Sequence, residues 1–224
     1  ILAGRLNNGT SQGHYMMHGN NKHKEQFPVL DEKERTWLLR TIVDEQKNGH
    51  KLTFLCIGLL DNLKYINPPA ESVSLCLMGG CFGLFFDGLQ APAGFPEYNV
   101  VHSIGCWQWA VGAFSDILIV PLDVAGLCRF REWPRRLKIF PKAYREMYET
   151  WFQSPQLRGS PILEGTKNGA LSSIQFDACA LYLCLYPEAA IVKSMQVEVT
   201  AEGETRELES GQGHVARVAL SWKD

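Results

Sequence analysis

Two short motifs and one aspartate in this sequence have side chains that could take part in binding or catalysis. Met78-Gly79-Gly80 follows an apolar run and is typical of a tight turn, whereas Glu97-Tyr98-Asn99 brings a carboxylate and a carboxamide into one polar loop. A carboxylate accepts hydrogen bonds, and a carboxamide both donates and accepts them. Asp177 stands at the predicted start of a late helix, where a helix N-cap alone would explain an aspartate. Taken singly, none of these residues names a reaction.

Other kinds of site find less support in the sequence. The seven cysteines include no C-x-x-C pair, and no Cys/His cluster has the spacing of a zinc site. Most of these cysteines have apolar neighbours, which favours buried free thiols in a reducing compartment. The sequence also contains no G-x-G-x-x-G and no P-loop, which argues against an unrelated nucleotide-binding α/β domain.

Three apolar runs are predicted to be the strands that position these residues. The runs are Leu52–Ile57, Ser74–Met78 and Ile117–Val120. Runs that are apolar throughout, with helices between them, are typical of parallel strands that are buried on both faces. In such sheets ligands bind beyond the carboxyl ends of the strands. We therefore expect the site where these runs end, at residues 57–58, 78–80 and 122–123.

Helices and a hairpin are predicted around these strands. Helical spacing or helix signals cover residues 31–48, 59–66, 104–114, 141–151 and 175–186. The polar stretches 1–30 and 156–169 are predicted to be loops. From Val192 onward apolar and polar residues alternate, which indicates an antiparallel hairpin added to the parallel sheet. With no linker and no repeat, residues 1–224 are predicted to form a single α/β domain.

Composition and charge exclude several classes of protein. The chain has 224 residues, of which 46% are hydrophobic and 21% charged, close to the average of globular domains. Its 22 Lys and Arg nearly balance 24 Asp and Glu, which argues against an electrostatic nucleic-acid partner. No apolar run reaches the ~18 residues of a membrane span, and no signal peptide follows the first residue, Ile1. We therefore expect no nucleic-acid or membrane partner and favour a cytoplasmic location.

Taken in order, the motifs resemble those of the inosine/uridine-preferring nucleoside hydrolases. That family carries a strand ending in T-G-P-L-T-N, a strand ending in M-G-G, a loop with E-F-N, a P-L-D-V-T-H strand, a helix opening with H-D, a proline-acidic pair and a late E-G-x-x-T-R stretch. The matching segments here are Ile57–Asn62, Met78–Gly80, Glu97–Asn99, Pro121–Gly126, Phe176-Asp177, Pro187-Glu188 and Glu202–Arg206. The resemblance covers residues 52–206 and implies a Rossmann-like, three-layer α/β fold: a mainly parallel sheet flanked by helices, with a C-terminal antiparallel hairpin.

The resemblance implies hydrolysis of the N-glycosidic bond of a nucleoside, with Ca²⁺ as the cofactor. A ribosyl transition state with oxocarbenium character needs nearby negative charge and a positioned water, and Ca²⁺ with hard oxygen ligands can hold the ribose diol and that water. The site residues it implies are the metal ligands Asp177 and Ile57, the latter through its backbone carbonyl, and the substrate-binding residues Met78, Glu97, Tyr98 and Asn99.

The sequence also departs from the family pattern. The D-x-D-P-G-x-D-D cluster, which gives the family its metal ligands and general base, is not found, and we expect the first strand of the fold to be missing. The family's leaving-group acid, the histidine of H-D, is Phe176 here, and its T-H pair is Ala125-Gly126. We therefore identify no catalytic residue in this chain, and we expect weak calcium binding and negligible nucleosidase activity from it.

Two hypotheses from different classes stay open. The chain derives either from an N-ribohydrolase whose parent carries the acidic cluster, or from a relative that serves as a non-catalytic nucleoside-binding or protein-interaction module. The upstream coding sequence would separate them, because a D-x-D-P-G-x-D-D stretch there would favour the enzyme. The expected partner is a small-molecule nucleoside, and a homo-oligomer is compatible with either hypothesis.

Overall fold

The computed structural model describes residues 52–65, 73–142, 171–209 and 211–223, together with residues 33, 36, 37, 40, 44, 145, 146, 148, 149 and 153. The chain divides into two compact units: unit 1 comprises residues 1–35 and 129–174, and unit 2 comprises residues 36–128 and 175–224. The single-domain organisation expected from the sequence stays a prediction. No helix in the described ranges is long and apolar enough to cross a membrane.

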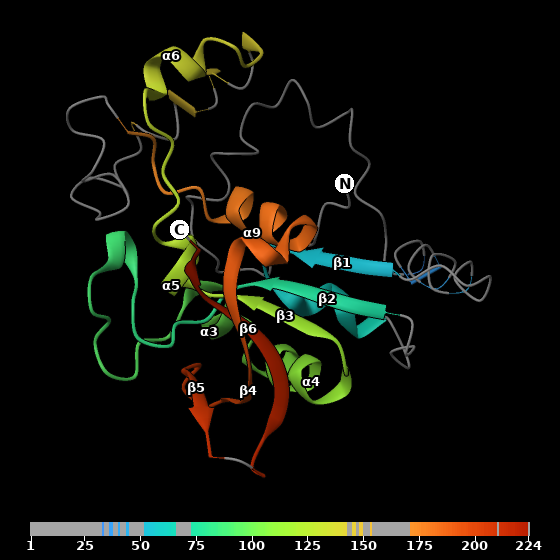
Figure 1. Ribbon diagram of the computed structural model, residues 1–224. Helices are drawn as coiled ribbons and strands as arrows, with labels where there is room; N and C mark the ends of the chain where they lie inside the picture. The colour runs from blue at the N-terminus through green and yellow to red at the C-terminus, as the bar shows by residue number, and fades with distance from the viewer. Residues whose placement is uncertain are drawn as a thin grey trace. The chain divides into compact units, whose positions relative to one another are not determined.

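Unit 2 is built on a six-stranded mixed sheet (Figure 1). In sheet order the strands are β1 (Leu52–Cys56), β2 (Val73–Met78), β3 (Ile117–Val120), β6 (His214–Trp222), β4 (Ala190–Val199) and β5 (Thr205–Leu208). The pairs β1–β2, β2–β3 and β3–β6 are parallel, whereas β6–β4 and β4–β5 are antiparallel. The predicted mainly parallel sheet with a C-terminal antiparallel hairpin is confirmed.

Burial explains why uninterrupted apolar runs form the central strands. Every residue of β2 and β3 is buried, and Leu77 of β2 lies in register with Ile119 of β3. Successive side chains of a strand point to opposite faces, so Leu77 joins one hydrophobic core and Met78 the other. Because both faces remove apolar surface from water, at about 25 cal/mol per Å², both must be covered.

Helices cover the two faces and complete three layers. α4 (Ile104–Ala113) buries Trp107 in the core that contains Leu77. α9 (Phe176–Leu185) buries Leu183 in the core of the opposite face, and Figure 1 shows the two helices on opposite sides of the sheet. This arrangement confirms the three-layer α/β prediction.

The remaining helices are short. They are α3 (Tyr98–Val101), α5 (Leu122–Ala125), α6 (Trp133–Leu137) and the 3-10 helices Leu60–Tyr65, Phe86–Gly88 and Pro187–Ala189. The predicted helices at 59–66, 104–114 and 175–186 are confirmed. Only some positions of the predicted helices at 31–48 and 141–151 belong to the described residues, and all of these are helical except Pro141. The predicted loops at 1–30 and 156–169 lie outside the described residues.

The parallel strands β1, β2 and β3 end at one edge of the sheet, which we call the carboxyl edge. Backbone hydrogen bonds continue beyond the strands there: the Gly79 N–H donates to the Val120 carbonyl at 3.2 Å, and the Leu122 N–H donates to the Gly80 carbonyl at 2.9 Å. Because Leu122 begins α5, the turn after β2 and the start of α5 are fastened together.

The described part of unit 1 contains an aromatic cluster around α6. Trp133 stacks on Phe130 with ring centroids 5.7 Å apart and contacts Tyr148 at 5.1 Å. Met78, Glu97, Asn99 and the other site residues predicted from the sequence all belong to unit 2.

Candidate functional site at the carboxyl edge of the sheet

Glu97 is the N-cap of α3 and ties this helix to the turn after β2. Its Oε2 atom accepts hydrogen bonds from the backbone N–H groups of Asn99 (2.9 Å), Val100 (3.2 Å) and Gly80 (3.3 Å). The side chain is 5% exposed. Burial raises the pKa of Glu97 to about 7, although hydrogen bonds from backbone N–H groups act in the opposite direction. The carboxyl group can therefore exchange a proton near neutral pH.

Asn99 joins Glu97 to Met78. Its Nδ2 donates to the Met78 carbonyl at 3.0 Å and lies 3.3 Å from the Met78 sulfur. Its backbone carbonyl accepts hydrogen bonds from Ser103 Oγ at 2.8 Å and from Trp107 Nε1 at 3.1 Å. The structure thus brings together three of the predicted substrate-binding residues, Met78, Glu97 and Asn99. Hydrogen bonds within the protein already occupy several of the donors and acceptors of Glu97 and Asn99.

Two glycines let the backbone come this close. A Cβ atom on Gly79 would lie 2.6 Å from the Trp107 ring and 2.9 Å from Glu97 Oε2. Gly80 has a φ of +89°, a conformation that side chains with a Cβ rarely adopt. The M-G-G motif is therefore required by close packing at this turn.

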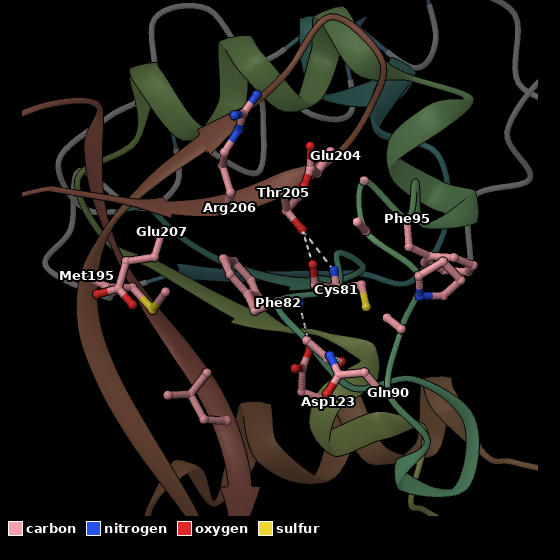
Figure 2. A pocket seen from close by; sticks show the side chains of 16 residues that line it. Cys81, Phe82, Gln90, Phe95, Asp123, Met195, Glu204, Thr205, Arg206 and Glu207 are labelled. Atoms are coloured by element: carbon pink, nitrogen blue, oxygen red, sulfur yellow. Dashed lines mark hydrogen bonds between the residues drawn. The ribbon is translucent and has the colours of Figure 1, made fainter.

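Thr205 and Asp123 hold the segment that follows the turn (Figure 2). Thr205 Oγ1, on β5, accepts the Cys81 N–H at 2.8 Å and donates to the Cys81 carbonyl at 3.1 Å. Asp123, in α5, accepts the N–H groups of Phe82 (2.8 Å) and Leu84 (2.9 Å), one with each carboxylate oxygen. From the sequence, Asp123 was predicted only to lie near the end of a strand, and no role was predicted for Thr205.

Asp177 lies in the first turn of α9 but is not its N-cap. Gln175 holds that position, and no side chain caps the helix. Asp177 is exposed, yet the protein atoms around its carboxyl group partly desolvate it and raise its pKa to about 6. An N-cap role therefore does not explain this aspartate, and its role as a metal ligand stays a prediction.

Ile57 and Tyr98 lie nearer to solvent than the residues around Glu97. Ile57 follows β1 and is 44% exposed. Tyr98 is 36% exposed, and its ring meets that of His102 edge-on at 4.3 Å. The carbonyl-ligand role of Ile57 and the substrate-binding role of Tyr98 stay predictions.

The described residues do not by themselves fit a calcium ion. Ca²⁺ takes six to eight oxygen ligands, whereas the predicted donors are one carboxylate, that of Asp177, and the backbone carbonyl of Ile57. In the described part of the chain no group of three or more His, Cys, Asp and Glu side chains could hold a metal ion. Further ligands would have to come from outside these residues.

Two departures from the family pattern are built into the local packing. Phe176 is half-buried and meets Phe86 edge-on, with ring centroids 5.9 Å apart. A Cβ atom on Gly126 would lie 2.6 Å from the Leu122 carbonyl oxygen and 2.7 Å from that of Phe85. A histidine at position 126 would therefore require the backbone to move.

A pocket of about 390 Å³ opens next to the segment after the turn (Figure 2). Phe82, Phe95, Asp123, Met195 and Arg206 are among its lining residues. None of the six site residues predicted from the sequence lines it.

Comparison with known proteins identifies the fold. The sequence matches no protein-family model and no curated protein. The structure is similar to a purine-preferring ribonucleoside hydrolase from Gardnerella vaginalis (TM-score 0.68, 15% identity, covering 99% of this chain and 73% of that one). It is also similar to a plant nucleoside hydrolase (TM-score 0.65, 14% identity, covering 98% of this chain and 73% of that one). A third similar structure is an inosine-uridine preferring nucleoside hydrolase from Bacillus anthracis (TM-score 0.64, 15% identity, covering 99% of this chain and 73% of that one). The chain therefore has the nucleoside hydrolase fold.

Proposed function

We propose that the carboxyl edge of unit 2 binds the ribose of a nucleoside, and that in the complete parent protein this edge serves hydrolysis of the N-glycosidic bond. One observation carries the proposal: in a chain with the nucleoside hydrolase fold, Met78, Glu97 and Asn99 meet where the parallel strands end. Ligands of such sheets bind at this edge.

Glu97 and Asn99 offer the chemistry that a vicinal diol requires. The three backbone hydrogen bonds described above end on Oε2 of Glu97, so Oε1 is the oxygen that would accept from a ribose hydroxyl. Asn99 donates through Nδ2, and its Oδ1 accepts no hydrogen bond within the described part of the structure. A carboxylate and a carboxamide together can accept from both hydroxyl groups.

Hydrolysis itself needs groups that the described residues do not supply. A base must activate water, and the leaving nucleobase must be stabilised. Under this proposal Asp177 and the Ile57 carbonyl contribute to a Ca²⁺ site whose other ligands lie outside the described residues. The residues at the carboxyl edge would bind and orient the sugar.

A second candidate, nucleoside binding without catalysis, is favoured by a separate observation. Phe176 cannot donate a proton and is packed against Phe86, and Gly126 leaves no space for a larger side chain. Both substitutions would remove catalysis and leave Glu97 and Asn99 in place.

Calorimetry with inosine and with 2′,3′-dideoxyinosine, which lacks the diol, tests the proposal. We expect inosine to bind and the dideoxy compound to bind more weakly. Glu97→Gln should weaken inosine binding about tenfold or more, because a hydrogen bond to a charged group contributes about 1.5–3 kcal/mol. Glu202→Gln, a change at an exposed residue between β4 and β5, is the matched control and should bind as the wild type does.

A ribose-release assay on the complete parent protein, with inosine as the substrate, separates the two candidates. Release by the complete parent supports the hydrolase, whereas binding by the parent without release supports the binding module. Equal affinity for inosine and its dideoxy analogue would contradict both, because neither hypothesis then explains Glu97 and Asn99.

A further inference from the structure

A short segment of unit 1, residues 129–142, is strongly basic. It holds six Lys and Arg residues and one acidic residue, Glu132. The rest of the chain then holds 16 Lys and Arg against 23 Asp and Glu. The near-balance of charge over the whole sequence therefore conceals a basic segment in an otherwise acidic protein.

The inner side of this segment is anchored in the aromatic cluster around α6. The helical path continues past α6, because the Ile139 N–H donates to the Arg136 carbonyl at 3.1 Å. Trp133 is 5% exposed, and its ring contacts that of Phe140, seven residues further on, with ring centroids 5.9 Å apart. Two turns of helical backbone are therefore held in place by aromatic packing on one side.

The outer side of the same turns carries cations around one exposed isoleucine. Residues three or four positions apart are neighbours on a helix, whereas residues two apart point to different sides. Ile139 therefore lies beside Arg135 and Arg136, and Arg135 points away from the side of Trp133. Ile139 is 82% exposed, and the three cations are also exposed. We call Arg135, Arg136, Lys138 and Ile139 the basic surface.

Ion pairs within the protein leave most of this positive charge available. Within the described ranges, Arg136 and Lys138 form no ion pair. Arg135 pairs with Glu132 at 3.5 Å, but the two side chains are 85% and 63% exposed, and exposed pairs of this kind contribute little. A partner with dense negative charge can therefore attract all three cations.

We propose that the basic surface binds the negatively charged headgroups of a lipid bilayer, with Ile139 entering the boundary between headgroups and acyl chains. Lys and Arg side chains are attracted to anionic lipids, and an apolar side chain among them adds the burial of hydrocarbon. The acidic remainder of the chain is repelled by the same lipids, so the attraction also favours one orientation on the bilayer.

The aromatic residues of the segment argue against a nucleic acid as the partner. Proteins that bind single strands stack the bases on exposed aromatic rings. Trp133 is buried and Phe140 is half-buried, whereas the side chain that reaches solvent between the cations is the aliphatic Ile139. A lipid surface makes use of such a residue.

The proposal differs from the expectation of no membrane partner that was drawn from the sequence. That expectation rested on the length of apolar runs, which matters for a segment that spans a bilayer. A protein that lies on the surface needs only cations and a few apolar side chains.

Sedimentation of the full chain with lipid vesicles tests the proposal. One set of vesicles consists of phosphatidylcholine alone, and the other contains phosphatidylserine, an anionic lipid, as well. We expect binding to the mixed vesicles only, and we expect it to weaken as salt is added, because salt screens exposed charges.

Removal of the three cations should weaken this binding about 100-fold. Each Lys or Arg near an anionic bilayer contributes about fivefold in affinity, so Arg135→Gln, Arg136→Gln and Lys138→Gln are combined in one variant. The matched control removes the same charge at exposed positions of unit 2, through Arg40→Gln, Lys193→Gln and Lys223→Gln. It should bind at least as well as the wild type.

Ile139→Ser tests the apolar contact and should weaken binding about tenfold. Ile191→Ser, at another exposed isoleucine, is its control and should have no effect. Thermal unfolding shows that each variant is folded, and the anisotropy of labelled polyuridylate reports binding to RNA. Equal binding to both kinds of vesicle, unchanged binding by Ile139→Ser, equal loss in the control variants, or binding of RNA without binding of vesicles would overturn the proposal.

Discussion

At the scale of single residues, the candidate site is a set of polar groups that also hold the backbone. Glu97 accepts three N–H groups through one oxygen and remains 5% exposed. Such bonds favour the charged carboxylate, but the loss of hydration disfavours it more strongly. The Glu97 carboxyl group therefore has a pKa near neutral pH, about 7.

The stability of the protein should depend on pH through Glu97. Its pKa is about 7 when folded and 4.5 in the reference state, so between these values the folded state binds more protons than the unfolded state. The contribution of Glu97 to stability is then fully present below pH 4.5 and is lost as the pH rises to 7, by at most about 3 kcal/mol. Urea unfolding at pH 5 and pH 8 measures it.

Glu97→Gln isolates this effect, because the amide keeps an acceptor oxygen for the backbone and does not titrate. Asp177, whose pKa is also raised, affects both proteins equally. The stability of the variant relative to the wild type should therefore increase from pH 5 to pH 8. The same difference at both pH values would contradict the burial of a titrating Glu97.

Gly79→Ala should destabilise the protein, because the new Cβ would lie 2.6 Å from the buried Trp107 ring. Overpacking of a core of this kind costs about 1–3 kcal/mol. Gly105→Ala is the matched control, since no atom lies within 4 Å of a Cβ there and alanine favours the helix. Thermal unfolding should rank Gly105→Ala at or above the wild type and Gly79→Ala below it.

Part of this site could be predicted from the sequence. Met78, Glu97 and Asn99 lie within a short stretch, and the strand-end rule places the first of them at the carboxyl edge. Thr205 could not be assigned its role, because it reaches Cys81 across 124 residues of sequence. Only the fold brings the two together.

At the scale of elements, continuous apolar runs and helical spacing predicted β1, β2, β3, α4 and α9. The alternating pattern predicted the late hairpin but not the direction of each side chain. Val215 and Val218 are both apolar residues of this alternating stretch, yet Val215 is 55% exposed whereas Val218 is fully buried. The two are an odd number of positions apart, so a regular strand places them on opposite faces.

The hairpin should contribute to the site through Thr205. Thr205→Val removes the hydroxyl that serves both the N–H and the carbonyl of Cys81, and leaving such buried groups unpaired costs about 1–3 kcal/mol. Thr53→Val, at an exposed position of β1, is the control and should be nearly neutral. Hydrogen exchange of the Cys81 amide should accelerate in the first variant only. Unchanged exchange there would contradict the contact.

At the scale of the whole molecule, the fold of nucleoside hydrolases persists at 14–15% identity. The three-layer architecture depends on the pattern of apolar positions along the chain, and many different sequences can share that pattern. The chemistry depends on single side chains, and Phe176 and Gly126 differ from the family pattern at two of them. The sequence therefore predicts the architecture more completely than it predicts activity.

Phe176→His should not create nucleosidase activity in this chain. The change returns a group that can carry a proton, but it supplies no base to activate water. It should also reduce stability slightly, because the half-buried contact with Phe86 is lost. Ribose release from inosine is the measurement, and a gain of about 10²-fold, the size expected when a missing general acid is returned, would contradict the prediction.

The measurement that tests the central claim most directly is a methyl NMR titration of Met78 with inosine. Met78 lies next to Asn99 Nδ2 at the carboxyl edge, and Met195, which lines the separate 390 Å³ pocket, reports on binding elsewhere. Our account predicts that inosine shifts the Met78 signal, that 2′,3′-dideoxyinosine does so much less, and that Met195 is unaffected by either. A shift of Met195 alone, or equal shifts of Met78 with both compounds, would contradict ribose recognition by Glu97 and Asn99.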